Sequence, residues 1–186
     1  MIALTEELLL NAQIFFIPDG TSVDGGTASI SSLPDNDPAT NWTDFEFGCI
    51  NRVQWSPEYK EEDRECADTV NGGYRTRKRR WVDRDMFDFT TLEYNENHHR
   101  LAFGIDGAIT PGTGQTPFAT KFREIDGWLR IVAGKEDGTE LCTGHLWVRL
   151  RLGDVPEWAN ASGSPVYQIE YLSSGSNDLD DITFAA

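Results

Sequence analysis

The side chains that most often catalyse reactions or bind metals are few in this chain and are not grouped. His98 and His99 are adjacent, so they cannot both face one metal ion from a helix, and no HxxxH or HExxH spacing occurs. His145 lies in an alternating stretch, where a packed or exposed neutral histidine is the usual state. No G-x-S-x-G nucleophile elbow is present. We therefore predict no catalytic residues, no cofactor and no metal site, and expect that the protein is not an enzyme.

The cysteines and the remaining candidate ligands lead to the same expectation. Cys49, Cys66 and Cys142 are widely spaced and form no CxxC pair, which favours reduced thiols over a disulfide or metal framework. The aspartates between residues 19 and 37 do not follow the spacing of a calcium-binding loop. Two alternatives stay open. Some of the 31 acidic residues could form the carboxylate pair of a hydrolase, and the six tryptophans could form the platform of a carbohydrate-binding β-sandwich instead of packing in a core or interface.

The length and the net charge of the chain limit its domain organisation and the kinds of partner that it can bind. A chain of 186 residues is most simply one domain, 1–186. The net charge of −15 argues against a protein that grips nucleic acid, because neutralising phosphates requires surplus lysine and arginine. It is compatible with a protein that lies beside nucleic acid without adhering to it. No apolar run approaches the ~20 residues that span a bilayer, and no signal peptide is visible, so we expect a soluble protein without membrane insertion.

Period-two alternation of apolar residues predicts a mainly β protein with an antiparallel sheet. The stretch 79–94 predicts a long strand, with Trp81, Phe87 and Phe89 on one face, followed by a short helix that Asn95 can cap. Surface loops are expected at 20–40 and 104–120, an N-terminal arm at 1–11, and a polar acidic tail at 173–186. Further strands are predicted at 12–17, 42–55, 128–133, 141–152 and 166–172.

The segment 56–78 has almost no core residues and a divided charge. Its first part is rich in acids, Asn71-Gly72-Gly73 is a hairpin-type turn, and residues 74–80 carry five bases. An acidic limb, a turn and a basic limb predict a projecting hairpin, too polar to be buried within its own subunit. Three interpretations stay open: a solvated loop whose charges pair internally, an arm that docks on a neighbouring copy, and a basic patch for nucleic acid.

Seven stretches of the sequence follow one another in a recognisable order. They are Asn11–Ile14, Trp42–Phe45, Gly48–Ile50, the charged loop 56–78, the strand into 93–103, Gly127–Ile131 and His145–Leu150. Their order resembles that of the tail tube proteins (major tail proteins) of long-tailed bacteriophages. The resemblance implies an antiparallel β-sandwich or barrel with one short flanking helix, long loops and extended terminal arms, assembled as hexameric rings that stack into a hollow tube for DNA.

Carried over to this sequence, the resemblance implies partners and contacts. The partners would be identical subunits and other tail proteins, in a virion tail assembled in the host cytoplasm, with the arms at 1–11 and 173–186 lying on neighbours. A head–tail joining protein or a tail terminator is the nearest alternative. The loop 56–78 would contact the adjacent ring, through Glu61, Glu62, Asp63, Arg64, Arg75, Arg77 and Lys78.

A tube that passes DNA without binding it should present acids to its bore, because a basic wall would hold the phosphates. The long strand carries three acids on an otherwise apolar ladder, at Asp83, Asp85 and Asp88. We expect these three side chains to line the bore.

Overall fold

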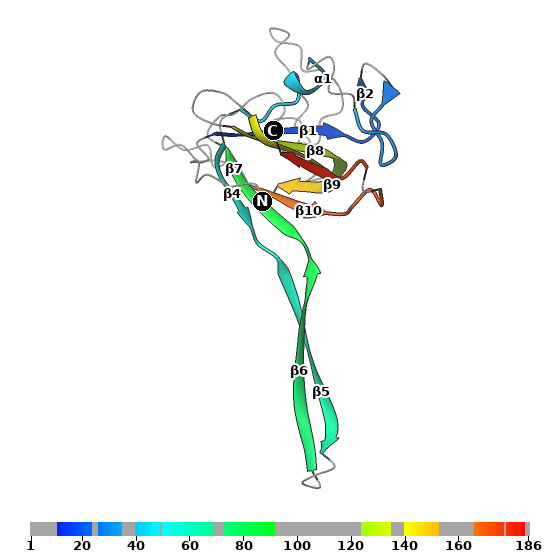
Figure 1. The fold of residues 1–186 in the computed structure, drawn as a ribbon, viewed down its shortest axis with the longest axis vertical. Coiled ribbons are helices and arrows are strands. Elements are labelled where there is room, and N and C mark those ends of the chain that lie inside the picture. The colour runs from blue at the N-terminus through cyan, green and yellow to red at the C-terminus, as the bar shows by residue number, and fades with distance from the viewer. Residues whose placement is uncertain are drawn as a thin grey trace, which may run out of the picture.

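The protein consists of a β body from which one long two-stranded arm projects (Figure 1). The arm is formed by β5 (Glu58–Asp68) and β6 (Gly73–Arg84), and the body by the other elements. No helix among the described residues has the length and apolarity to cross a membrane. The computed structural model describes residues 11–23, 26–34, 40–48, 50–68, 73–91, 124–134, 140–152, 166–176 and 178–184.

The body is one antiparallel sheet, as the alternation predicted. Its strands run in the order β1-β8-β9-β10-β7-β4, and β11 pairs with the half of β9 that β10 leaves open. A two-stranded β2–β3 sheet and one helical turn, α1, lie beside it. The bounds are β1 (Asn11–Pro18), β2 (Ser22–Val23), β3 (Gly26–Thr27), α1 (Thr40–Thr43), β4 (Ile50–Trp55), β7 (Met86–Thr91), β8 (Ile125–Gly134), β9 (Glu140–Leu152), β10 (Val166–Tyr171) and β11 (Asp181–Phe184).

The sheet curls until its two end strands meet. The free edge of β1 is covered by residues 45–47, where Phe16 N donates to Phe45 O (3.1 Å) and Phe47 N donates to Ile14 O (2.9 Å). The same segment leads through Gly48 towards β4, the strand at the other end of the sheet. Gly48 has a φ of 74°, a left-handed conformation that glycine adopts without strain, and it turns the chain at this point. The body is therefore a curled antiparallel sheet whose edge at β1 is not left bare.

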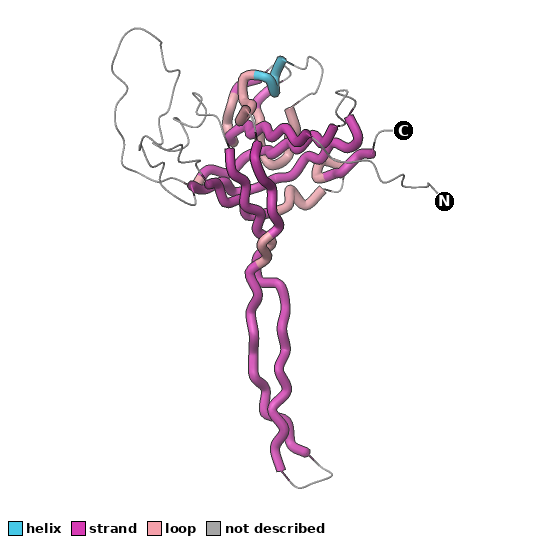
Figure 2. Tube along the Cα trace, turned by 90° about the vertical axis from the view of Figure 1, so that its left-hand side faces the viewer, coloured by secondary structure: helices cyan, strands magenta, loops and turns pink. Residues whose placement is uncertain are grey.

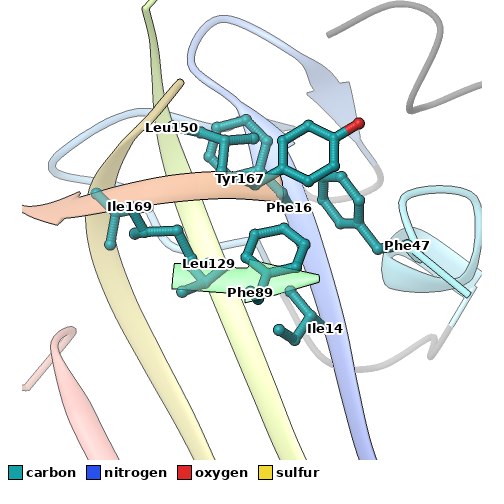
Figure 3. Packing of buried hydrophobic residues seen from close by; sticks show 9 residues of the cluster. Ile14, Phe16, Phe47, Phe89, Leu129, Leu150, Tyr167 and Ile169 are labelled. Carbon is teal, nitrogen blue, oxygen red and sulfur yellow. The ribbon is translucent and has the colours of Figure 1, made fainter. Parts of the chain in front are cut away.

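Both faces of the sheet are apolar, so the body has an inner and an outer core. The inner core contains an aromatic group in which Phe47, Phe89 and Tyr167 lie 5.0–5.2 Å apart between ring centroids (Figure 3). Such edge and offset contacts add about 0.5–1.5 kcal/mol per pair to the burial of the rings. The inner core comprises Ile14, Phe16, Phe47, Phe89, Leu129, Val148, Leu150, Tyr167 and Ile169.

The outer core lies beneath the loop 20–34 and α1. Trp128 is fully buried there, and its Nε1 donates to Ser29 O (2.7 Å) and Ser32 O (3.1 Å), which fixes the loop to β8. Burial of Trp42, Trp128 and Trp147 confirms the core role for these three tryptophans, and the loop expected on the surface is partly a core cover. The outer core comprises Phe15, Ile17, Ala28, Trp42, Trp128, Val132 and Trp147.

Two of the predicted strands differ from the structure. The strand predicted at 42–55 is wrong in its first half: Trp42 lies in α1, and the strand begins only at Ile50, after the turn at Gly48. The long strand predicted from residue 79 is divided at Asp85, because β6 pairs with β5 whereas β7 pairs with β4 and β10. The helix expected after Asn95, the loop 104–120 and the arm 1–10 lie outside the described residues.

The C-terminal segment folds against its own sheet instead of extending as an arm throughout. Asp180 fixes the turn before β11: its carboxylate accepts from Trp147 N (2.8 Å), Ser173 Oγ (3.1 Å) and Ser174 N. These bonds place β11 in register with β9, from Asp181 opposite His145 to Phe184 opposite Cys142.

Candidate assembly interface

The arm is a ribbon of two antiparallel strands that extends away from the body and, among the described strands, pairs with no other (Figures 1 and 2). Its register runs from Glu58 opposite Arg84 to Asp68 opposite Gly73, with one irregularity between Glu58 and Tyr59. The projecting hairpin predicted from the charge pattern is thus present. Every arm side chain that the structure describes is exposed, at 58–65, 76 and 78–84.

Charge is segregated between the two strands. β5 carries six acidic and two basic residues, and β6 carries six basic residues and one acidic residue. Ion pairs cross the ribbon from Lys60 to Asp83 (3.0 Å), from Arg80 to Glu61 (3.7 Å) and from Arg84 to Glu58 (3.9 Å). Exposed ion pairs of this kind contribute about 0–1 kcal/mol each. They set the register of the strands but provide little free energy to hold the ribbon.

Large apolar side chains are exposed near the base of the arm. Tyr59, Trp81 and Val82 are 46%, 38% and 41% exposed, and Tyr59 lies opposite Val82 in the register. The guanidinium of Arg80 lies 4.0 Å from the Tyr59 ring centroid, and that of Arg79 lies 5.7 Å from the Trp81 centroid. Exposed aromatic residues beside arginine have the composition of interaction surfaces.

The junction between arm and body is fixed by backbone bonds. Ser56 N donates to Met86 O (2.8 Å), and Tyr171 N donates to Asp85 O (2.9 Å). Arg84 lies between Glu58 of the arm and Glu170 of β10, at 3.9 and 3.6 Å from Nε. The arm is therefore held at its root while the rest of the ribbon extends away.

The residues predicted for contacts between rings all fall on the arm. Glu61, Glu62, Asp63, Arg64 and Lys78 are exposed side chains. For the other two, Arg75 and Arg77, the structure describes the backbone alone, paired with Cys66 and Arg64 in the register.

The prediction missed the root of the arm, which includes Tyr59, Arg79, Arg80, Trp81 and Val82. Trp81 and Val82 were predicted to lie on opposite faces of one long strand from residue 79, together with residues that the structure places in the body. The signal that could have found them is the length of the acidic limb: a hairpin turning at residues 71–72 pairs Glu58 with a residue near Arg84.

The three acids expected in the bore do not form one row. Asp83 forms a bidentate contact with Lys60, at 3.0 and 3.1 Å. Asp88 lies in the body, where Ser56 Oγ donates to it at 2.5 Å, and Asp85 is exposed at the junction between β6 and β7. Division of the strand at Asp85 separates these acids between the two parts of the molecule.

A second polar group lies on the outer face of the body. Arg130 of β8 is opposite His145 of β9, which is in turn opposite Asp181 of β11, and the His145 ring lies 5.6 Å from that of Trp42. The pKa of His145 is lowered to about 4, mainly by burial and to a lesser extent by the nearby positive charge of Arg130, against a smaller raising effect of Asp181. Arg130 also has a lowered pKa, mainly because it is partly buried. We infer that this group is part of the packing between α1 and the sheet.

No three His, Cys, Asp or Glu side chains come together as a metal site in the described part of the chain. Arg149 donates to both carboxylate oxygens of Asp126 (2.7 and 3.0 Å), and the hydrogen bond raises the arginine pKa. That pair is a surface link between β8 and β9.

No protein-family model and no curated protein matches the chain. Among solved structures it is similar to the tube-terminating cap of the anti-feeding prophage, with a TM-score of 0.39 and 9% sequence identity. The match covers 76% of this chain and 84% of the cap. A similarity of this size carries no argument about function.

Proposed function

We propose that this protein is a structural subunit of a bacteriophage tail. It would assemble into hexameric rings that stack and form the tail tube. The observation that carries the proposal is the arm, a ribbon of exposed and mostly charged residues on a body that already has its own packed cores. An isolated two-stranded ribbon is marginally stable in water. The two strands of the arm are 11 and 12 residues long and extend away from the core. We therefore infer that they bind a partner outside their own subunit.

Identical copies of the chain are the partner that best fits an exposed, charged arm. The predicted contact residues lie on the arm together with the exposed Tyr59 and Trp81, so polar and aromatic contacts are available on one element. A heterologous contact repeated by rotation closes a ring, and the length of the arm lets it reach beyond the body of its own subunit.

The acidic composition supports a channel for DNA. With a net charge of −15, like-charge repulsion keeps DNA from adhering to the wall of the tube. Of Asp83, Asp85 and Asp88, Asp85 is the acid best placed for this role, since Asp83 is paired with Lys60 and Asp88 with Ser56. In assembled tails, Asp85→Lys should leave the tube intact and slow DNA ejection, with Asp85→Asn intermediate. Ejection at the wild-type rate in both variants would remove the acidic-bore role.

Electron microscopy of the purified protein at rising concentration tests the main proposal. Tubes or stacks of rings are expected, and their formation should weaken with salt because the arm contacts are charged. A single ring that never stacks would favour a head–tail joining or terminator protein. Isolated particles at every concentration, also with a tail-initiating complex present, would contradict the proposal.

A further inference from the structure

The arm has two free strand edges. Within the described residues, β5 pairs only with β6 and β6 only with β5, so each strand has one side whose backbone N–H and C=O groups meet no other strand. Natural proteins usually cover or shorten such edges, because a bare edge is a template for pairing with another chain. Here both edges are long, and the described arm side chains are exposed along their length.

The two edges carry opposite charge. The β5 edge is acidic and the β6 edge is basic. A charge pattern whose purpose is to keep copies apart would place the same sign on both edges, so that every approach is repelled. The observed pattern repels β5 from β5 and β6 from β6, which disfavours a two-fold contact between arms. It attracts the β6 edge of one copy to the β5 edge of another.

We propose that the arms of neighbouring copies join edge to edge, β6 of one copy beside β5 of the next. This inference rests on the proposed assembly into rings and specifies the contact within it. Arms that all point in one direction place β6 antiparallel to the next β5, so the ribbon continues as an antiparallel sheet. Each acidic strand then lies between two basic strands, and each basic strand between two acidic ones.

Rotation about an axis parallel to the arms also fixes the level of the contacts. Such a rotation leaves every residue at its height, so the neighbour's Glu61 comes level with Arg80, Glu62 with Arg79, and Asp63 with Lys78. These are the pairs that already face each other within one arm. Tyr59 would lie beside the neighbour's Val82 and Trp81 beside the neighbour's Lys60, so part of their exposed surface would be covered.

A charge-swapped variant tests this arrangement. The variant exchanges the charges of three cross-strand pairs, so each pair within the arm keeps opposite charges. Its six substitutions are Glu61→Arg with Arg80→Glu, Glu62→Arg with Arg79→Glu, and Asp63→Lys with Lys78→Asp. Swapped copies should assemble with one another, since acid still meets base between copies. In mixtures with wild type, acid meets acid or base meets base at every mixed contact. Tagged swapped protein is co-expressed with untagged wild type, isolated by its tag, and analysed for the fraction of wild type retained.

The arrangement predicts that retained wild type falls more than about tenfold below the level for tagged wild type, since like charges across an interface are strongly unfavourable. The control is Arg79→Lys/Arg80→Lys, which alters the contacts with Tyr59 and Trp81 but keeps the charge, and should mix freely. Free mixing of the swapped variant would overturn edge pairing while leaving ring assembly in place. Failure of the wild type itself to assemble would overturn both proposals.

Discussion

The hairpins β8–β9 and β5–β6 are both regular antiparallel pairs, but they rest on different supports. In β8–β9, Leu129 and Val148 are buried on the inner face, and Trp128 and Trp147 on the outer face. In the arm, every described side chain is exposed. The body can therefore hold its strands by apolar burial, at roughly 25 cal/mol per Å². The arm lacks that term, and for this reason we propose that neighbouring copies order it.

The largest expected effect is in the outer core. Trp128→Ala leaves a cavity between β8 and the loop 20–34 and removes the donor to Ser29 and Ser32, and should lower the free energy of unfolding by about 3–5 kcal/mol. Urea unfolding followed by circular dichroism measures this. A loss below about 1 kcal/mol would mean that the loop does not depend on the outer core.

A methyl group at Gly127 tests how closely β1 and β8 pack. A Cβ there would lie 2.3 Å from Ile17 O and 2.9 Å from Phe16 Cζ, so the backbone must shift. Gly127→Ala should cost about 1–3 kcal/mol or more in unfolding free energy. The matched control is Gly144→Ala, whose Cβ would lie 3.3 Å from the flexible side chain of Ile182. Equal effects of the two substitutions would contradict the packing described.

Part of the body could be predicted from the sequence. The alternation in 141–152 predicted β9 because apolar residues recur at every second position, which places them on one face of a strand. Division of the long strand at Asp85 was not readable, since it depends on β6 and β7 having different partners far away in the chain. Trp81 and Val82 resemble core residues in type, and only the pairing with β5 places them in the arm. A glycine inside a predicted strand suggests a bulge or a bend, which fits the turn at Gly48, but no residue pattern predicted α1 before it.

Acid should weaken the body through His145. Its pKa is about 4 in the folded protein, against an ordinary value of 6.5, so the unfolded chain binds the extra proton between these two values. The free energy of unfolding therefore falls as the pH drops from 6.5 to 4. Above pH 6.5 the stabilisation that comes from the neutral His145 is fully present. After allowance for partial exposure we expect about 1–2 kcal/mol.

The measurement is urea unfolding at pH 7 and pH 4.5 for wild type and for His145→Phe, which keeps a ring beside Trp42. The variant should lose less stability over this interval than the wild type. Arg130 and Asp181 are unchanged in both proteins, so equal losses would assign the acid sensitivity to other groups.

The smallest effect on the fold is expected in the arm. Trp81→Ala should change the unfolding free energy of the body by less than about 0.5 kcal/mol, because the side chain is exposed and touches none of the core. The same variant should weaken self-association in sedimentation velocity. A destabilised body with unchanged self-association would contradict the assignment of Trp81 to an interaction surface outside the core.

Hydrogen–deuterium exchange of the wild-type protein, before and after assembly, tests the account most directly. Amides of β8 and β9 should be protected in both states. Amides of β5 and β6 should exchange much faster in the free subunit and become protected after assembly, including those that face away from the partner strand. Protection of the arm equal to that of the body in the free subunit, or no gain on assembly, would contradict the account.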